Sequence, residues 1–128
     1  MQNANERICS YTDLVVWQKA VELVTEIYKA TSTFPREEMF GLTSQMRRSA
    51  VSVPSNIAEG QGRATKGEFI QFLATARGSL FELKTQVHIA GALGFLTSER
   101  TDELTLRADR IGQLLNGLLR SLGGVRHR

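Results

Sequence analysis

The chain has 128 residues, which is enough for one domain with a single core but too few for two independent cores. Hydrophobic residues make up 41% of the chain and charged residues 23%, a composition that argues against global disorder. The formal net charge of +3 is too small to indicate a nucleic-acid-binding protein by itself.

The N-terminal sequence and the single cysteine point to the cytoplasm. MQNANERICSY lacks the apolar run of a signal peptide, and no segment approaches the roughly 20 apolar residues of a membrane span. Cys9 is the only cysteine, so an internal disulfide is impossible and a reducing compartment is the simplest interpretation. We therefore expect a cytoplasmic protein with no membrane partner.

The first helix is expected over about residues 13–31, after a flexible polar arm over residues 1–11. Thr12 or Asp13 can cap it, because a short oxygen side chain accepts a hydrogen bond from an unpaired backbone N–H. Its predicted core residues recur every three or four positions: Leu14, Trp17, Val21, Val24 and Tyr28. A second row widens this stripe: Ala20, Leu23 and Ile27. The aromatic residues of the first row are interpreted as packing groups and not as base-stacking groups.

The second helix is expected over about residues 36–60, directly after Pro35. Glu37 and Glu38 fall in its first turn, where negative charge is favourable. Its core residues are spaced four and three apart: Met39, Thr43, Met46, Ala50, Val53 and Ile57.

Pro54 and two glycines shape the end of this helix. Because proline has no N–H, the carbonyl of Ala50 loses its usual partner and we expect a kink near Pro54. Nearby polar side chains can partly repair the hydrogen bonding: Ser52, Ser55 and Asn56. Gly60 and Gly62 are expected to end the helix. The sequence GQG at 60–62 resembles a phosphate-binding loop only superficially, since it follows a helix and lacks the Walker lysine spacing.

The third helix is expected over about residues 66–93 and begins with a capping box, TKGE, in which Thr65 and Glu68 stand three positions apart. Its core residues keep the four-and-three spacing: Phe69, Leu73, Ala76, Leu80, Leu83, Val87 and Ala90. Further apolar residues lie away from this row, and they exceed what one bundle core needs: Ile70, Ala74, Phe81 and Ala92.

The fourth helix is expected over about residues 98–122, with Thr97 or Ser98 as its cap. Its core residues repeat in the same way: Leu104, Ala108, Ile111, Leu115, Leu118 and Leu122. The glycine pair at 123–124 ends this helix, and a basic tail follows over residues 125–128.

These patterns predict an all-α fold, an antiparallel up-down-up-down four-helix bundle over residues 12–124. No alternating strand pattern occurs. The apolar flanks left over on the second and third helices predict a closed homo-oligomer. The residues expected at its interface are Val51, Pro54, Ile70 and Phe81.

No residue pattern indicates catalysis, a metal site or a bound cofactor. The Glu-x-x-His pairs of di-iron bundles are absent, and the histidines are His88, off the core row, and His127, in the tail. Cys9 stands in a polar arm without the neighbours that activate a thiol. We therefore expect a protein that is not an enzyme and needs no cofactor.

Basic residues gather in two parts of the chain. Residues 104–128 hold five arginines and one acidic residue. In the second helix, Arg47 and Arg48 lie off the core row, so both are expected to be available to a partner. Two interpretations stay open. Arg48 pairs with Glu59 on a solvated face, or a polyanion-binding patch forms from Arg47, Arg48, Arg63, Lys66 and Arg77.

Several segments resemble the bacterial four-helix-bundle proteins that are also called 23S ribosomal RNA intervening-sequence proteins. They are DLVVWQKA at 13–20, FPREEMFGLTSQMRRSAVSVPSNIAEGQGR at 34–63, EFIQFLATARGSLFEL at 68–83 and LGFL at 93–96. The resemblance covers about residues 11–97, and the fourth helix matches only in pattern. The residues that match the family signature are Arg47, Arg48, Pro54, Asn56, Glu59, Gly60 and Arg63.

The resemblance implies a small cytosolic bundle that usually assembles into a homopentameric barrel. More distantly, the chain is similar to accessory proteins of diversity-generating retroelements, whose basic surface engages nucleic acid and a reverse transcriptase. The family resemblance leaves the molecular role open. Asn56 and Glu59 could serve only to close the turn after the second helix. We expect a non-enzymatic homo-oligomer that binds RNA or DNA. The alternative is a scaffold that binds another protein through its apolar flanks.

Overall fold

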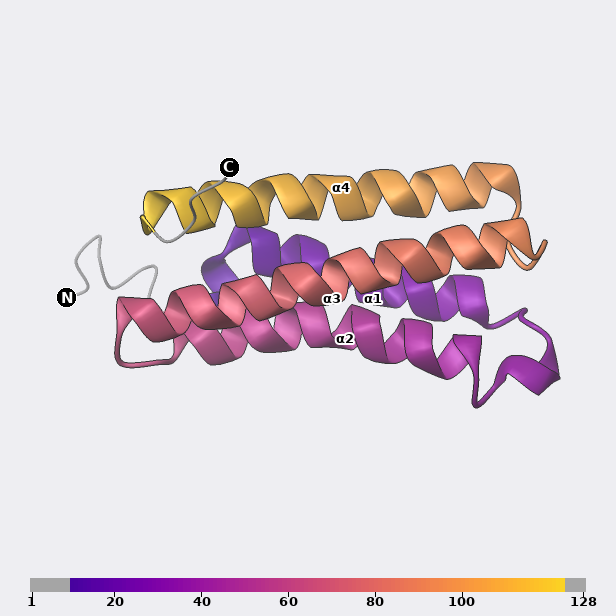
Figure 1. The fold of residues 1–128 in the computed structure, drawn as a ribbon, viewed down its shortest axis with the longest axis horizontal. Coiled ribbons are helices and arrows are strands. Elements are labelled where there is room, and N and C mark those ends of the chain that lie inside the picture. Colours follow the sequence, from indigo (N-terminus) through magenta and orange to yellow (C-terminus); the bar gives the residue numbers. More distant parts are fainter. Residues whose placement is uncertain (1–9, 124–128) are drawn as a thin grey trace.

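The computed structural model describes residues 10–123, which form four long helices and two short 3₁₀ turns and contain no strand (Figure 1). In chain order the elements are η2 (Tyr11–Asp13), α1 (Val15–Thr31), η3 (Arg36–Glu38), α2 (Leu42–Gln61), α3 (Lys66–Ala92) and α4 (Ser98–Ser121). Consecutive helices pack antiparallel and α4 also packs on α1, which confirms the predicted four-helix bundle. Within residues 10–123, no helix is both long and apolar enough to cross a bilayer.

Most of the predicted N-terminal arm and the whole basic tail lie outside the described residues. Cys9 and His127 belong to these segments. The predictions made for them are therefore left as predictions.

The start of α1 differs from the expected one, because the chain first forms the turn η2. Ser10 caps this turn, and its hydroxyl accepts a hydrogen bond from the Thr12 N–H at 3.2 Å. Leu14 precedes α1 without a side-chain capping bond, so the predicted capping by Thr12 or Asp13 is wrong. Gln18 Nε2 donates to the Thr12 carbonyl at 2.8 Å and links the first turn of α1 to η2.

The core face of α1 is rotated from the predicted row. Its buried hydrophobic residues are Val16, Ala20, Leu23, Ile27 and Ala30, which include the row expected only to widen the stripe. Tyr28, predicted in the core, is 43% exposed. Trp17 is half-buried, and its ring meets that of Tyr11 edge-on with 5.2 Å between the ring centres. Both aromatic rings therefore lie at the edge of the core.

α2 begins later than predicted, at Leu42. The turn Arg36–Glu38 comes first, and Gly41, with φ −110° and ψ −114°, separates that turn from the helix. Glu38 Oε1 accepts a hydrogen bond from the Leu42 N–H at 3.1 Å, so an acidic residue outside α2 caps its first turn. Met39 consequently stands outside the helix and is half exposed. The rest of the predicted core row is buried: Thr43, Met46, Ala50, Val53 and Ile57.

α2 is continuous through Pro54, and the kink expected there stays a prediction. Asn56 Nδ2 donates to the Ser52 carbonyl at 2.8 Å, one of the local hydrogen bonds expected to compensate for the proline. Gly60 does not end the helix. It is buried, and a Cβ added to it would lie 2.7 Å from Phe72 Cβ on α3. The residue thus permits the close approach of α2 and α3 beside their turn.

The bounds and caps of α3 and α4 agree with the sequence. The Thr65 hydroxyl accepts from the Glu68 N–H at 3.1 Å, and the Thr97 hydroxyl accepts from the Arg100 N–H at 3.0 Å. Every predicted core residue of α3 except the half-buried Phe69 is fully buried. In α4 the row ends on buried Leu119 instead of the half-buried pair Leu118 and Leu122: the buried residues are Leu104, Ala108, Ile111, Leu115 and Leu119.

Candidate interaction surfaces

Arg47 is half-buried and lies against the last turn of α1. Its Nε donates to the Thr31 hydroxyl at 2.9 Å, and its Nη2 donates to the Tyr28 carbonyl at 3.4 Å. The guanidinium also lies over the Tyr28 ring, 4.5 Å from the ring centre. A cation is favourable at a helix C-terminus, so Arg47 satisfies and stabilises the end of α1. Arg47 is therefore already engaged within the chain, and its predicted contact with nucleic acid stays a prediction.

Arg63, and not Arg48, is the partner of Glu59. Arg63 Nη2 donates to Glu59 Oε2 at 2.7 Å, and the guanidinium lies 4.8 Å from the centre of the Phe72 ring. The predicted pair of Arg48 with Glu59 does not form, because the two residues lie about 16 Å apart along the helix at 1.5 Å per residue. Arg63 and Glu59 thus brace the turn between α2 and α3.

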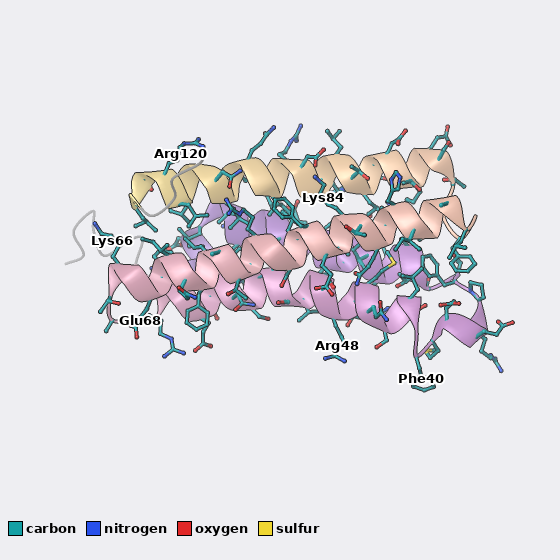
Figure 2. The ribbon with its side chains drawn as sticks, in the orientation of Figure 1. Phe40, Arg48, Lys66, Glu68, Lys84 and Arg120 are labelled. Carbon is teal, nitrogen blue, oxygen red and sulfur yellow. The ribbon has the colours of Figure 1, made fainter. Side chains whose placement is uncertain are left out.

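The remaining predicted basic residues divide between an interhelical contact and solvent. Arg77 Nη1 donates to Asn116 Oδ1 at 2.9 Å and ties α3 to α4. Arg48 projects from α2 into solvent and Lys66 stands at the start of α3 (Figure 2). Across residues 10–123, neither of these two forms a hydrogen bond or an ion pair through its side chain. Because Arg47 lies against α1 and Arg77 against α4, the five residues do not form one compact cluster.

α3 carries an exposed row of uncharged and largely small or apolar residues, which no other helix of the bundle matches. An exposed row follows the same four-and-three spacing as the core row: Ala74, Gly78, Phe81, Thr85, His88 and Ala92. Phe81 is 53% exposed, and no heavy atom lies within 4 Å of a Cβ added to Gly78. The outer faces of α1 and α4 instead present charges such as Glu22 and Arg110. A helix that is apolar on two sides is suited to packing on two sides.

The four residues expected at an oligomer interface differ in exposure. Val51 is 40% exposed on α2, and Ile70 is half-buried against the core. Pro54 is buried within the single chain and offers little surface to a neighbour. Phe81 lies in the outer row of α3 and lines a groove shared with α4. An interface is therefore better centred on α3 than on α2.

A network of charged residues joins α1 to α4. Arg100 donates to Glu26 Oε1 at 3.0 Å through Nη2 and to Glu103 Oε1 at 2.7 Å through Nη1. Arg107 extends the network, with its Nε 3.5 Å from Glu103 Oε2. The hydrogen bond from Arg100 lowers the pKa of the Glu26 carboxyl, and it lowers the pKa of Glu103 in the same way. The network fixes the two terminal helices of the bundle together.

Residues 10–123 contain no group of three or more histidine, cysteine, aspartate or glutamate side chains that could hold a metal ion. His88 is exposed on the outer face of α3. The expectations of no catalysis, no metal and no cofactor stay predictions.

Replacing Arg47 by alanine should destabilise the fold, whereas replacing its neighbour Arg48 should not. Arg47→Ala removes a charge-assisted hydrogen bond to Thr31 and the cation–π contact with Tyr28 at the end of α1, at a cost of about 1–2 kcal/mol. Arg48→Ala, on an exposed side chain, should change the free energy of unfolding by less than about 0.5 kcal/mol. Urea unfolding followed by circular dichroism compares the two variants. Equal stability of both would contradict the assigned role of Arg47.

The bridge between Glu26 and Arg100 should make stability depend on acidity. Because the folded pKa of Glu26 lies below its ordinary value of 4.5, its contribution is present above that pH and is lost as the pH falls through the folded value. Glu26→Gln should therefore reduce stability by about 1 kcal/mol at neutral pH and by progressively less in acid. Exposed Glu37→Gln is the control. A Glu26→Gln deficit that stays constant into the acidic range would refute this linkage.

Comparison with known proteins places these features in a family. A family model described as 23S rRNA-intervening sequence protein matches residues 12–117. A crystal structure of a protein of unknown function from the S23 ribosomal protein family of Bacteroides thetaiotaomicron VPI-5482 has a TM-score of 0.75 and 23% sequence identity. That match covers 83% of this chain and 99% of the other, and at this identity it shows a shared fold alone. None of the curated proteins matches the chain.

The family match extends beyond the segments that carry the resemblance in the sequence, because it includes most of α4. It spans well over half of the chain and contains the arginine pair, Pro54 and the turn between α2 and α3. The chain belongs to the 23S rRNA-intervening sequence protein family.

Proposed function

We propose that this protein is a non-enzymatic homo-oligomer, assembled through the outer face of α3, that binds RNA or DNA through basic side chains. The observation that carries the assembly is the exposed uncharged row from Ala74 to Ala92. The binding of nucleic acid is supported by the exposed basic residues that have no intramolecular partner among the described residues.

Burial against a second copy explains why α3 has two apolar faces. Leaving Phe81 half exposed forgoes much of the roughly 1.5–3 kcal/mol that a fully buried aromatic side chain contributes. Ala74 and Gly78 are small, so another helix can approach this face closely. Closed symmetric rings are a usual outcome of such contacts, and the resemblance to the family favours a homopentamer.

Oligomerisation would also strengthen weak binding to a polyanion. Arg48 and Lys66 are exposed and uncompensated in one chain, and a ring repeats them around its axis. Arg63 adds to these, since its side chain is 43% exposed and a guanidinium carries more donors than its bond to Glu59 uses. The distant similarity to retroelement accessory proteins with a basic nucleic-acid-binding surface also supports binding of nucleic acid.

The alternative is a scaffold that binds another protein, and one observation favours it. Phe40 is 95% exposed beside half-exposed Met39, at the end of the bundle where the chain enters α2 (Figure 2). Exposed aromatic and methionine side chains are common in protein interfaces. A partner captured from the native host that persists after nuclease treatment and at high salt, and is lost in Phe40→Ser, would favour this scaffold.

Adding a charge to the outer face of α3 should dissociate the oligomer without unfolding the chain. Gly78→Lys places a cation in the row, while the open space around Gly78 lets the folded chain accept the side chain. Light scattering should give an oligomer for the unchanged protein and the mass of one chain for the variant. Thr25→Lys, on the exposed face of α1, is the control. A monomeric unchanged protein, or an unaffected Gly78→Lys oligomer, would overturn the proposed assembly.

Gel-shift titration against structured RNA at two salt concentrations tests the nucleic-acid proposal. Binding should weaken with salt because released counterions drive it, and each lost phosphate contact lowers the log–log slope by about 0.7–0.9. Arg48→Ala should weaken binding, and combining it with Arg63→Ala and Lys66→Ala should weaken it further. Arg36→Ala, on the exposed turn η3, is the control for charge. Absence of binding at low salt would eliminate the proposal.

A further inference from the structure

A polar groove lies between α2 and α3, on the side of α3 opposite to the groove that Phe81 and Lys84 share with α4. Its volume is about 270 Å³. The side chains that line it are Gln45, Arg48, Ser49 and Ser52 from α2, and Ser79 and Glu82 from α3. The α2 wall of the groove therefore comes from the segment around the arginine pair, which is part of the sequence that resembles the family.

Hydroxyl groups connect the two walls of the groove. Ser52 Oγ and Ser79 Oγ are hydrogen-bonded at 2.8 Å across the helix interface, and Asn56 Nδ2 donates to Ser52 Oγ at 3.0 Å. Ser49 is buried beside them. One turn beyond Glu82, the buried Oε1 of Gln86 finds no hydrogen-bond partner in the part of the chain that is described. The interface between α2 and α3 is thus unusually polar for a bundle interior.

The rims of the groove carry opposite charges that do not neutralise each other. Arg48 stands on the α2 rim and Glu82 on the α3 rim, and both are exposed. Within residues 10–123, neither side chain takes part in an ion pair or a side-chain hydrogen bond. The groove therefore offers a cationic donor on one side, an anionic acceptor on the other and hydroxyl groups between them.

We propose that this groove binds the sugar–phosphate unit of RNA, with Arg48 on the phosphate and Glu82 accepting a hydrogen bond from the ribose 2′-hydroxyl. The inference rests on the proposed nucleic-acid binding and specifies which nucleic acid is preferred. A carboxylate beside a phosphate chain is repulsive unless the ligand supplies a donor to it. The 2′-hydroxyl is the donor that RNA has at every nucleotide and DNA lacks.

The remaining features of the groove fit a segment of a longer chain better than a free small molecule. Its volume is just below the roughly 300 Å³ at which small-molecule pockets begin. Serine hydroxyls both donate and accept, which suits the oxygen atoms of a sugar. Phe81, Thr85 and His88 of the apolar row border the grooves that α3 shares with α4, whereas the polar groove lies on the α2 side. A second copy packed on the α4 side of this row would leave the polar groove open.

Three oligouridines of equal length separate recognition of the 2′-hydroxyl from recognition of charge. They are the ribose form, the deoxyribose form and the 2′-O-methyl form, which keeps a 2′-oxygen but cannot donate. Fluorescence anisotropy with the full-length protein at one salt concentration should show the ribose form bound about tenfold more tightly than the other two. Equal affinities for all three would refute the ribose contact while leaving the nucleic-acid proposal intact.

Variants then locate the contact. Glu82→Ala should remove the preference by weakening the ribose form alone, since loss of a negative charge cannot weaken binding of the deoxyribose form. Arg48→Ala should weaken all three probes. Glu99→Ala, which removes the same charge from the start of α4, should keep the preference. A ribose preference that survives in Glu82→Ala would overturn the assignment to this groove, and absence of binding to every probe would overturn both proposals.

Discussion

The close packing of α2 against α3 determines where the other surfaces of the bundle lie. Beside their turn, Gly60 leaves no room for even a methyl group against Phe72. Further along the same interface, Ser52 and Ser79 are small enough to meet through a direct hydrogen bond. Because small and polar residues line this close interface, a groove with serine hydroxyls lies along it between α2 and α3. The groove with α4 lies on the opposite side of α3. A larger apolar residue at Ser52 or Ser79 would fill the groove and separate its two walls.

The arginines of this chain divide according to the geometry of their neighbours. Arg47 and Arg48 are adjacent in the sequence, yet a helical turn directs consecutive side chains about 100° apart. Arg47 meets the carbonyl end of α1 and the ring of Tyr28, where it is useful to the fold. Arg48 meets solvent and the polar groove. A shared sequence motif therefore contains one residue that stabilises the bundle and one that is free to bind a ligand.

The sequence predicted the bundle well, because burial of one face requires apolar residues at four-and-three spacing along each long helix. One residue that departs from this spacing does not hide the pattern. The core rows of α2 and α3 agree with the structure almost residue for residue. The first predicted row of α1 lies at the edge of the core and not at its centre, because Trp17 and Tyr28 count as apolar in a pattern although their rings meet Tyr11 and Arg47. Of these two residues only Tyr28 is exposed. The start of α2 was wrong because Glu38 suits a first turn and also suits capping from outside it. Arg48 was a wrong partner for Glu59 because the angular position of a residue around the helix axis says nothing of its distance along that axis. Arg63, four residues from Glu59, is close enough to pair with it.

The uncharged row of α3 and the polar groove are complementary parts of one arrangement. The row lies toward α4 and the groove toward α2, so assembly through the first need not cover the second. In a closed ring every copy would then present its own groove, and one strand could contact several of them. Linked weak contacts gain affinity through effective concentration, so a groove that engages a single sugar–phosphate unit weakly can still retain a long RNA. The modest net charge of the chain is compatible with the proposed arrangement, because repetition of the groove in a ring would supply the affinity that the charge of one chain lacks.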